Sequence, residues 1–134
     1  MSYRPKAQHN AAKNDDDRII FTGFVQGQML KELYSNAYVY TLPSDLEGMP
    51  LSLLEAMSYG NCCLVSNIPE CTEVVEDKAL VFKKSDVNDL LAEIQKGCDY
   101  PDMIMKMKEQ ATDFICRKYN WDFVTKETMN LYRR

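Results

Sequence analysis

Short apolar runs rich in β-branched and aromatic residues alternate along this chain with segments in which apolar residues recur at helical spacing. The runs are predicted to be strands, at residues 18–22, 38–42, 62–66 and 79–82. Helices are expected at residues 28–36, 50–59, 70–75, 87–97, 101–117 and 121–132. Strict alternation of strand and helix is typical of a parallel sheet covered on both faces. The predicted fold is therefore α/β, a Rossmann-like doubly wound parallel sheet of about four strands.

The chain divides by composition into a polar tail and one domain. Residues 1–17 are polar, end in three aspartates, and are expected to be frayed or to form a short helix from Lys6 to Lys13. Residues 18–134 carry all the predicted strands. With 134 residues in all, 46% of them hydrophobic, the chain is long enough for a substantial core.

Charge and hydropathy disfavour several classes of partner. The formal net charge is -4 without a basic stripe, which argues against nucleic-acid binding. No apolar run approaches the roughly 20 residues of a membrane-spanning helix, and the N-terminus lacks the apolar core of a signal peptide. We therefore expect a cytoplasmic protein. The five cysteines have no metal-ligand spacing and are expected to be buried thiols.

The segment from Pro43 to Gly60, PSDLEGMPLSLLEAMSYG, is the most informative for function. It places two carboxylates, Glu47 and Glu55, around the start of a short helix, with seven residues between them. Gly48 and Pro50 mark the turn, since proline is tolerated in a first helical turn. Amides there lack intrahelical acceptors and can bind an anion such as phosphate; the ones expected to be free are those of Met49, Leu51 and Ser52. A nucleotide sugar, with its anionic centre and hydroxyl-rich ends, matches this arrangement.

The segment resembles the donor-binding motif of the family-four (group 1) retaining glycosyltransferases, and the likeness extends over roughly residues 17–134, most of the chain. Residues 18–25 resemble the strand and loop that border the nucleobase, residues 33–40 the next helix and strand, and residues 62–73 the strand and loop after the motif helix. The resemblance implies part of the C-terminal, donor-binding half of a GT-B fold. It also implies an enzyme, a hexosyltransferase that moves a sugar from a nucleotide diphosphate to a hydroxyl acceptor with retention of configuration.

The resemblance assigns a role to each candidate site residue. Glu47 is implied to be catalytic: it would orient the donor sugar and stabilise positive charge at the anomeric carbon. Glu55 would hold the ribose hydroxyls. The rest of the donor-binding set consists of Gly23, Phe24 and Val25 beside the base, and Gly48, Met49, Pro50, Leu51 and Ser52 beside the phosphates. No cofactor and no metal are expected, since the only run of aspartates, at residues 15–17, lies in the polar tail.

The predicted partners are a nucleotide sugar and a sugar or lipid-linked acceptor. The family's basic diphosphate clamp has no counterpart before Arg18, and its acceptor-binding N-terminal domain is not part of this chain. We therefore expect a donor-binding fragment, truncated at its N-terminal side, with little activity alone. The apolar face of residues 121–132 suggests a homodimer as a further expectation.

Two other classes of function remain open. A non-catalytic nucleotide-binding or assembly module could keep the fold without the chemistry. An unrelated α/β hydrolase could use Glu47 and Glu55 as an acid/base pair, although the phosphate-ready helix start between them argues against it. A dinucleotide dehydrogenase is disfavoured because no GxGxxG run follows a strand.

Overall fold

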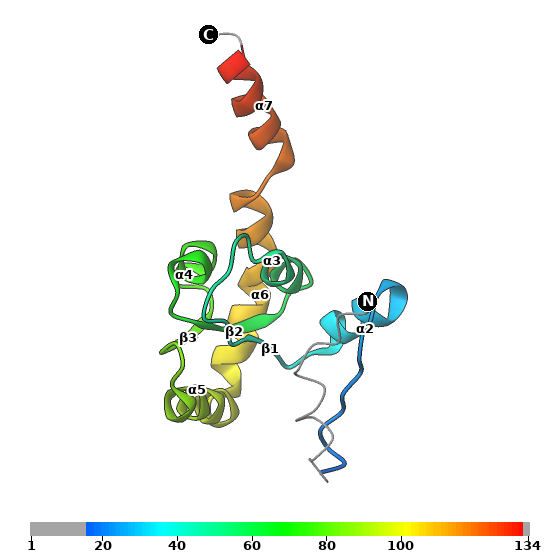
Figure 1. Cartoon of the computed structure of the whole chain (residues 1–134), viewed down its shortest axis with the longest axis vertical. Coiled ribbons are helices and arrows are strands. Elements are labelled where there is room, and N and C mark those ends of the chain that lie inside the picture. The colour runs from blue at the N-terminus through cyan, green and yellow to red at the C-terminus, as the bar shows by residue number, and fades with distance from the viewer. Residues whose placement is uncertain (1–15, 133–134) are drawn as a thin grey trace, which may run out of the picture. The chain divides into compact units, whose positions relative to one another are not determined.

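The computed structural model describes residues 16–132 (Figure 1). The chain forms two compact units, Met1–Lys31 and Glu32–Arg134, and the boundary between them falls within helix α2, Gly27–Asn36. The predicted short helix at residues 6–13 lies outside the described residues.

The described part of the first unit contains a turn where a strand was predicted. Arg18 forms an ion pair with Asp16 at 2.6 Å, and the amide of Ile19 donates to the Asp16 carbonyl oxygen at 2.9 Å. Residues 18–22 are not in a strand, so the prediction there is wrong. Apolar and β-branched composition favours an extended backbone, but a strand also needs a neighbour to pair with its N–H and C=O groups.

The sheet in the second unit has three parallel strands in the order β1-β2-β3 (Figure 1). The strands are β1 (Val39–Leu42), β2 (Cys62–Ser66) and β3 (Leu80–Phe82). Val39 pairs with Cys62, and Leu64 pairs with Leu80. Since all three strands run in the same direction, the loops that follow them emerge at one edge of the sheet. That edge is where the loop from Pro43 to Pro50 begins.

The helices lie close to their predicted positions. Their bounds are α3 Leu51–Ser58, α4 Pro69–Val75, α5 Val87–Asp99, α6 Pro101–Lys118 and α7 Trp121–Tyr132. The predicted ends at Gly60 and Asp86 are confirmed. Gly60 has φ +76° just after α3, and the Asp86 carboxylate accepts a hydrogen bond from the Asp89 amide at 2.9 Å. Helix α5 ends at Asp99, two residues after the predicted end, and Gly97 is buried within it against Ile104.

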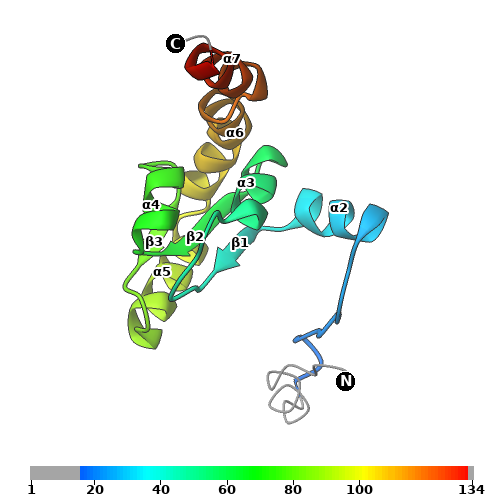
Figure 2. The same cartoon turned by 45° about the horizontal axis from the view of Figure 1, so that its top comes forward.

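Helices cover both faces of the sheet, as Figures 1 and 2 show with α3 and α4 on one side of the strands and α5 on the other. On the α5 side, alternate residues of β2 and β3 form a core with Ile104 of α6; the strand residues are Cys62, Leu64, Leu80 and Phe82. Alternation along β2 turns Cys63 and Val65 to the opposite face, where α3 and α4 pack. The predicted doubly wound architecture is confirmed, with three strands in place of about four.

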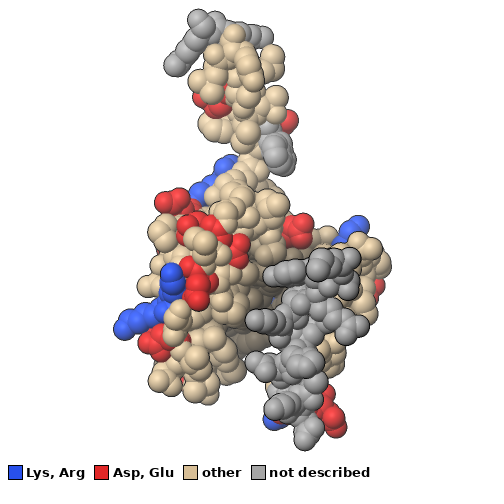
Figure 3. Space-filling view, viewed as in Figure 1, with Lys and Arg blue, Asp and Glu red and all other residues tan. Residues whose placement is uncertain are grey.

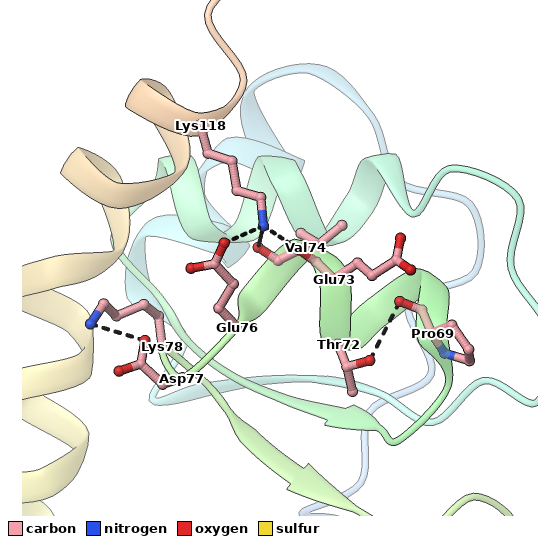
Figure 4. A network of polar contacts seen from close by, with 8 residues as sticks. All are labelled: Pro69, Thr72, Glu73, Val74, Glu76, Asp77, Lys78 and Lys118. Carbon is pink, nitrogen blue, oxygen red and sulfur yellow. Dashed lines mark hydrogen bonds and ion pairs between the residues drawn. The ribbon is translucent and has the colours of Figure 1, made fainter.

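The C-terminal end of α4 is held by a lysine from α6 (Figure 4). The Lys118 ammonium donates to the main-chain carbonyl oxygens of Glu73 and Val74 and lies 2.9 Å from the Glu76 carboxylate. Glu76 has φ +50° just after the helix, where the chain leaves helical geometry. A cation at unpaired helical carbonyls stabilises a helix end. Lys118 therefore links α4 to α6.

Burial corrects one prediction, that all five cysteines are buried. Cys62, Cys63 and Cys71 are buried as predicted, whereas Cys98 and Cys116 are exposed, because the helix faces that carry them have no cover. Helix α7 extends beyond α6, away from the sheet (Figure 1), and Phe123 and Tyr132 on it are exposed. None of the helices in the described part of the chain has the length and apolar character needed to cross a membrane.

Candidate functional site

The loop between β1 and α3 is tied to the neighbouring loops at the carboxyl edge of the sheet. The Ser85 hydroxyl, in the loop after β3, donates to the Asp45 carboxylate at 2.7 Å. Asn67, which follows β2, accepts a hydrogen bond at its side-chain oxygen from the Lys84 amide at 2.8 Å. Its own amide donates to the Phe82 carbonyl oxygen at 2.9 Å. These bonds join all three strand ends into one connected edge.

Glu47 lies in this loop and is half-buried. Its carboxylate accepts a short hydrogen bond, 2.5 Å, from the hydroxyl of Ser44. A carboxylate can accept about four hydrogen bonds, so this contact orients the group and leaves most of its acceptor capacity unused. Burial, followed by the charges of Glu47 and Glu70, raises the pKa of the nearby Cys71 thiol. Glu47 is thus a fixed acceptor beside the start of α4.

Pro50 shapes the start of α3. Its φ of -77° and ψ of 72° are those of an inverse γ-turn, in which the Leu51 amide donates to the Met49 carbonyl oxygen at 2.8 Å. The prediction that the Leu51 amide is free is therefore wrong. Among the described residues, the amides of Met49 and Ser52 have no hydrogen-bond acceptor. The helix N-terminus thus presents two N–H groups instead of three.

Glu55 lies on the exposed face of α3, beside an aromatic cluster. Tyr34 of α2 is buried, and the negative charge of Glu55 lies near enough to act on its pKa. Burial, then the charges of Tyr40 and Glu55, raises the pKa of Tyr34 to about 12. The phenol therefore keeps its proton at neutral pH.

Tyr40 of β1 reaches the same helix. Its hydroxyl donates to the Ser52 hydroxyl at 2.8 Å, and burial is the main cause that raises its pKa. Sequence reasoning did not single out Tyr34 or Tyr40. One signal was available in the sequence: each tyrosine stands at a position where the apolar spacing would place a buried side chain. A buried phenol needs a hydrogen-bond partner, which a buried leucine does not, so a tyrosine at such a position indicates a polar contact.

The remaining predicted site residues, Gly23, Phe24 and Val25, belong to the first unit and precede α2. Gly23 has φ +67°, a backbone conformation that residues with a Cβ rarely adopt, so its glycine is required by the turn itself. Their predicted place beside a nucleobase stays a prediction. Gly48, in the second unit, is exposed in the loop next to Glu47.

Charge around the second unit is mixed. Lysine, arginine and acidic side chains lie next to one another on the face shown in Figure 3. A pocket of about 530 Å³ between the end of α4 and α6 is lined by both signs of charge, including Glu109, Asp113 and Arg117. It lies at the C-terminal end of α4, and since α4 begins at the carboxyl edge of the sheet, this is the end remote from Glu47. In residues 16–132, no three His, Cys, Asp or Glu side chains gather as metal ligands would.

Comparisons with known proteins place residues 3–114 in one family, described as glycosyl transferases group 1. The chain is similar to an uncharacterized glycosyltransferase of Methanocaldococcus jannaschii, with 30% identity over 123 residues that cover 87% of this chain and 30% of that protein. It is also similar to the O-antigen chain mannosyltransferase B of Escherichia coli, with 31% identity, 86% of this chain and 30% of the relative. The chain thus spans about a third of the length of these relatives.

Solved structures support the same placement. Sucrose-phosphate synthase from Thermosynechococcus elongatus superposes with a TM-score of 0.76 at 26% identity, covering 95% of this chain and 32% of that one. The crystal structure of TarM shares the fold alone, with a TM-score of 0.81 at 18% identity, covering 96% of this chain and 26% of that one. The architecture is that of part of the C-terminal half of a GT-B fold. By its sequence and its fold, the chain belongs to the glycosyl transferases of group 1.

Proposed function

We propose that this chain binds the nucleotide-diphosphate sugar donor of a retaining glycosyltransferase. The observation that carries the proposal is the order of groups around the start of α3. The half-buried Glu47 comes first, the free amides of Met49 and Ser52 follow, and Glu55 lies one turn further on. This order matches that of a sugar, a diphosphate and a ribose.

Each group has a chemical task in this proposal. The two amides and the positive end of the helix dipole bind the diphosphate and stabilise the charge that develops on it as it leaves. Glu55 accepts hydrogen bonds from the ribose hydroxyls. Glu47, oriented by Ser44, accepts hydrogen bonds from the donor sugar and faces the positive charge at its anomeric carbon. We assign the base-binding role to Gly23, Phe24 and Val25 on the resemblance alone.

The reaction we propose breaks the bond between the anomeric carbon and the diphosphate oxygen. The acceptor hydroxyl oxygen forms the new bond to the same carbon on the same face of the sugar, and its proton passes to the departing diphosphate. The products are a glycoside and a nucleoside diphosphate. The amides, with no metal among the assigned groups, are the electrophiles that this chain contributes to that step.

We propose that residues 18–134 form the domain that binds the nucleotide-sugar donor. The relatives are about three times longer than this chain, each match covering about 30% of the relative. We therefore propose that the acceptor, a sugar or a lipid-linked hydroxyl, is bound by a separate N-terminal domain, and that this chain alone transfers sugar poorly.

Titration of the chain with uridine diphosphate and guanosine diphosphate tests the proposal. Saturable binding of either compound is expected by calorimetry or ligand-observed NMR. Glu55→Ala should weaken it by about tenfold or more, because a charged acceptor is lost. Glu73→Ala is the matched control, since Glu73 is an exposed helical glutamate on α4. No binding at millimolar nucleotide would overturn the proposal and favour an assembly role.

A further inference from the structure

The loop of residues 43–50, which carries Glu47, is joined by a side chain to the loop that follows β3. The Ser85 hydroxyl donates to the Asp45 carboxylate at 2.7 Å. The other side-chain hydrogen bond of this loop, from Ser44 to Glu47, lies within the loop itself. In residues 16–132, the bond from Ser85 is therefore the side-chain hydrogen bond that ties this loop to another part of the chain.

This part of the loop is not packed tightly against α5. A pocket of about 330 Å³ lies beside the bond, and its lining includes Pro43 and Asp45 of the loop together with Val87 and Leu90 of α5. Side chains that leave such a space between them make few of the contacts by which a packed core holds a segment in place. The position of the loop therefore depends strongly on the hydrogen bond.

The donor of this bond stands on a strained but fixed backbone. Ser85 has φ +59°, in the left-handed region that residues with a Cβ rarely adopt. The residues before it are held by side chains from elsewhere. The Lys83 amide donates to the Asp89 carboxylate at 2.6 Å, and the Lys84 amide donates to the side-chain oxygen of Asn67 at 2.8 Å. Such strain persists where the surroundings fix the backbone, and it is concentrated at functional sites.

We propose that Ser85 and Asp45 are positioning residues of the donor site, whose hydrogen bond holds the loop where Glu47 accepts the hydroxyls of the donor sugar. The inference rests on the proposed function, and it assigns neither residue a contact with the donor. Asp45 lies two residues before Glu47, so a shift of one displaces the other. Without the bond the loop adopts further conformations, and the apparent affinity falls with the fraction that can bind.

Loss of the bond should affect the sugar more than the nucleotide. Glu47, which is assigned to the sugar, lies in the loop, whereas Ser52 and Glu55 lie on α3, outside it. The informative quantity is the dissociation constant of a sugar nucleotide divided by that of the matching nucleoside diphosphate. This ratio, called the sugar ratio below, isolates the contribution of the sugar.

The experiment uses the full chain and two variants of one residue. Asp45→Ala removes the acceptor, whereas Asp45→Asn keeps an acceptor oxygen. Calorimetry or ligand-observed NMR measures dissociation constants for uridine diphosphate, guanosine diphosphate, uridine diphosphate glucose and guanosine diphosphate mannose. The sugar ratio should rise about threefold to tenfold in Asp45→Ala and stay within about twofold of the native value in Asp45→Asn.

Asp113→Ala is the matched control. The Asp113 side chain is 79% exposed and bonds one partner, Arg117, and it lines the pocket at the end of α4 remote from Glu47. This variant also loses an exposed carboxylate and should keep the native sugar ratio.

Ser85→Gly separates positioning from stability. Glycine adopts a positive φ without strain, so the Tm of this variant should equal or exceed that of the native chain. The hydroxyl is lost, so the sugar ratio should rise as in Asp45→Ala. A residue that serves stability alone would not show this combination.

The outcomes separate the two proposals. Nucleotide binding with an unchanged sugar ratio in Asp45→Ala and Ser85→Gly overturns the positioning role and leaves nucleotide binding standing. Equal weakening of all four compounds shows a general structural effect and also overturns the role. A sugar ratio in Asp45→Asn as high as in Asp45→Ala would show that Asp45 acts by its charge, against the role. If the native chain binds none of the compounds, the proposed function fails and the role fails with it.

A further measurement needs no ligand. Order parameters from ¹⁵N relaxation report the motion of backbone amides on the picosecond to nanosecond timescale. The order parameters of Glu47 and Gly48 should be lower in Asp45→Ala and Ser85→Gly than in the native chain and Asp45→Asn. Native values in every variant would show that the bond does not hold the loop, and they would overturn the inference.

Discussion

The ammonium of Lys118 lies 2.9 Å from the Glu76 carboxylate, across the gap between the last turn of α6 and the end of α4. The same ammonium donates to two main-chain carbonyl oxygens of α4. The Lys118 side chain is 25% exposed, so this contact is partly shielded from water. Together the bonds fix the end of a helix whose other end lies at the candidate site.

Lys118→Met should therefore lower the free energy of unfolding by about 1–2 kcal/mol, because two carbonyl oxygens and a carboxylate lose a charged donor. Urea titration followed by circular dichroism measures the change. Arg117→Met is the matched control: Arg117 pairs with Asp113 at 3.2 Å, but both side chains are about four-fifths exposed, at 82% and 79%. Arg117→Met should lower the free energy of unfolding by less than about 0.5 kcal/mol. Equal losses would contradict the role of Lys118.

Asn61→Ala should lower the free energy of unfolding by about 2–3 kcal/mol. Asn61 is 2% exposed, and its loss leaves the Tyr34 and Ala56 carbonyl oxygens without this donor. Asn36→Ala provides the comparison, because its side-chain amide also donates to a carbonyl oxygen, that of Glu32 at 2.8 Å, but at the surface. Thermal unfolding should show a clear fall in Tm for the first variant only.

Stability should fall at alkaline pH. The pKa of Tyr34 rises from 10.0 to about 12 and that of Cys62 from 9.0 to about 11, with burial as the largest cause in each case. Between the ordinary and raised values, the unfolded chain has released a proton that the folded chain retains. The contribution of these two groups to the free energy of unfolding is therefore complete below their ordinary pKa values and is lost as pH rises through about 9 to 12.

Urea unfolding at increasing pH over that range measures the effect. Tyr34→Phe should show a smaller loss of stability than the native chain between pH 10.0 and about 12, because phenylalanine cannot ionise. The same slope in both proteins would show that Tyr34 does not carry this dependence.

Side chains at the start of α3 should matter less to nucleotide binding than the main chain. Met49 is 51% exposed, and the proposed contact is made by its amide. Met49→Ala should keep the affinity for nucleoside diphosphate within about twofold, whereas Glu55→Ala should lose about tenfold. Uridine without phosphate should bind much more weakly than uridine diphosphate. Equal binding of the nucleoside and the diphosphate would argue against phosphate recognition at this helix.

Sequence reasoning predicted the features that depend on neighbouring residues. Hydrophobic spacing placed the helices and three of the strands within a few residues, and Asp86 and Gly60 marked helix ends through local hydrogen bonding and backbone freedom. The carboxyl edge of the sheet followed from strand direction. These predictions needed no knowledge of the tertiary fold.

The predictions were wrong where the local structure or the burial of a residue depends on residues far away in the sequence. Whether residues 18–22 become a strand depends on a pairing partner, and whether Cys98 or Cys116 is buried depends on what covers its helix. The stacking of the Tyr34 ring on the Tyr59 ring joins two distant segments of the chain and leaves no local pattern. Pro50 illustrates a subtler case. Its place at the helix start was predicted, but the γ-turn that engages the Leu51 amide depends on its ψ angle, which proline does not fix.

Because three of the five cysteines are buried and two are exposed, the reaction of their thiols can report local unfolding of the domain. A thiol-reactive dye should label Cys98 and Cys116 at once. Cys62, Cys63 and Cys71 should react only when the sheet or α4 opens, so the delay between the two phases would time that opening. A ligand that stabilises the carboxyl edge of the sheet near Glu47 would slow the labelling of Cys71. The rate of dye labelling would then measure ligand binding without any substitution.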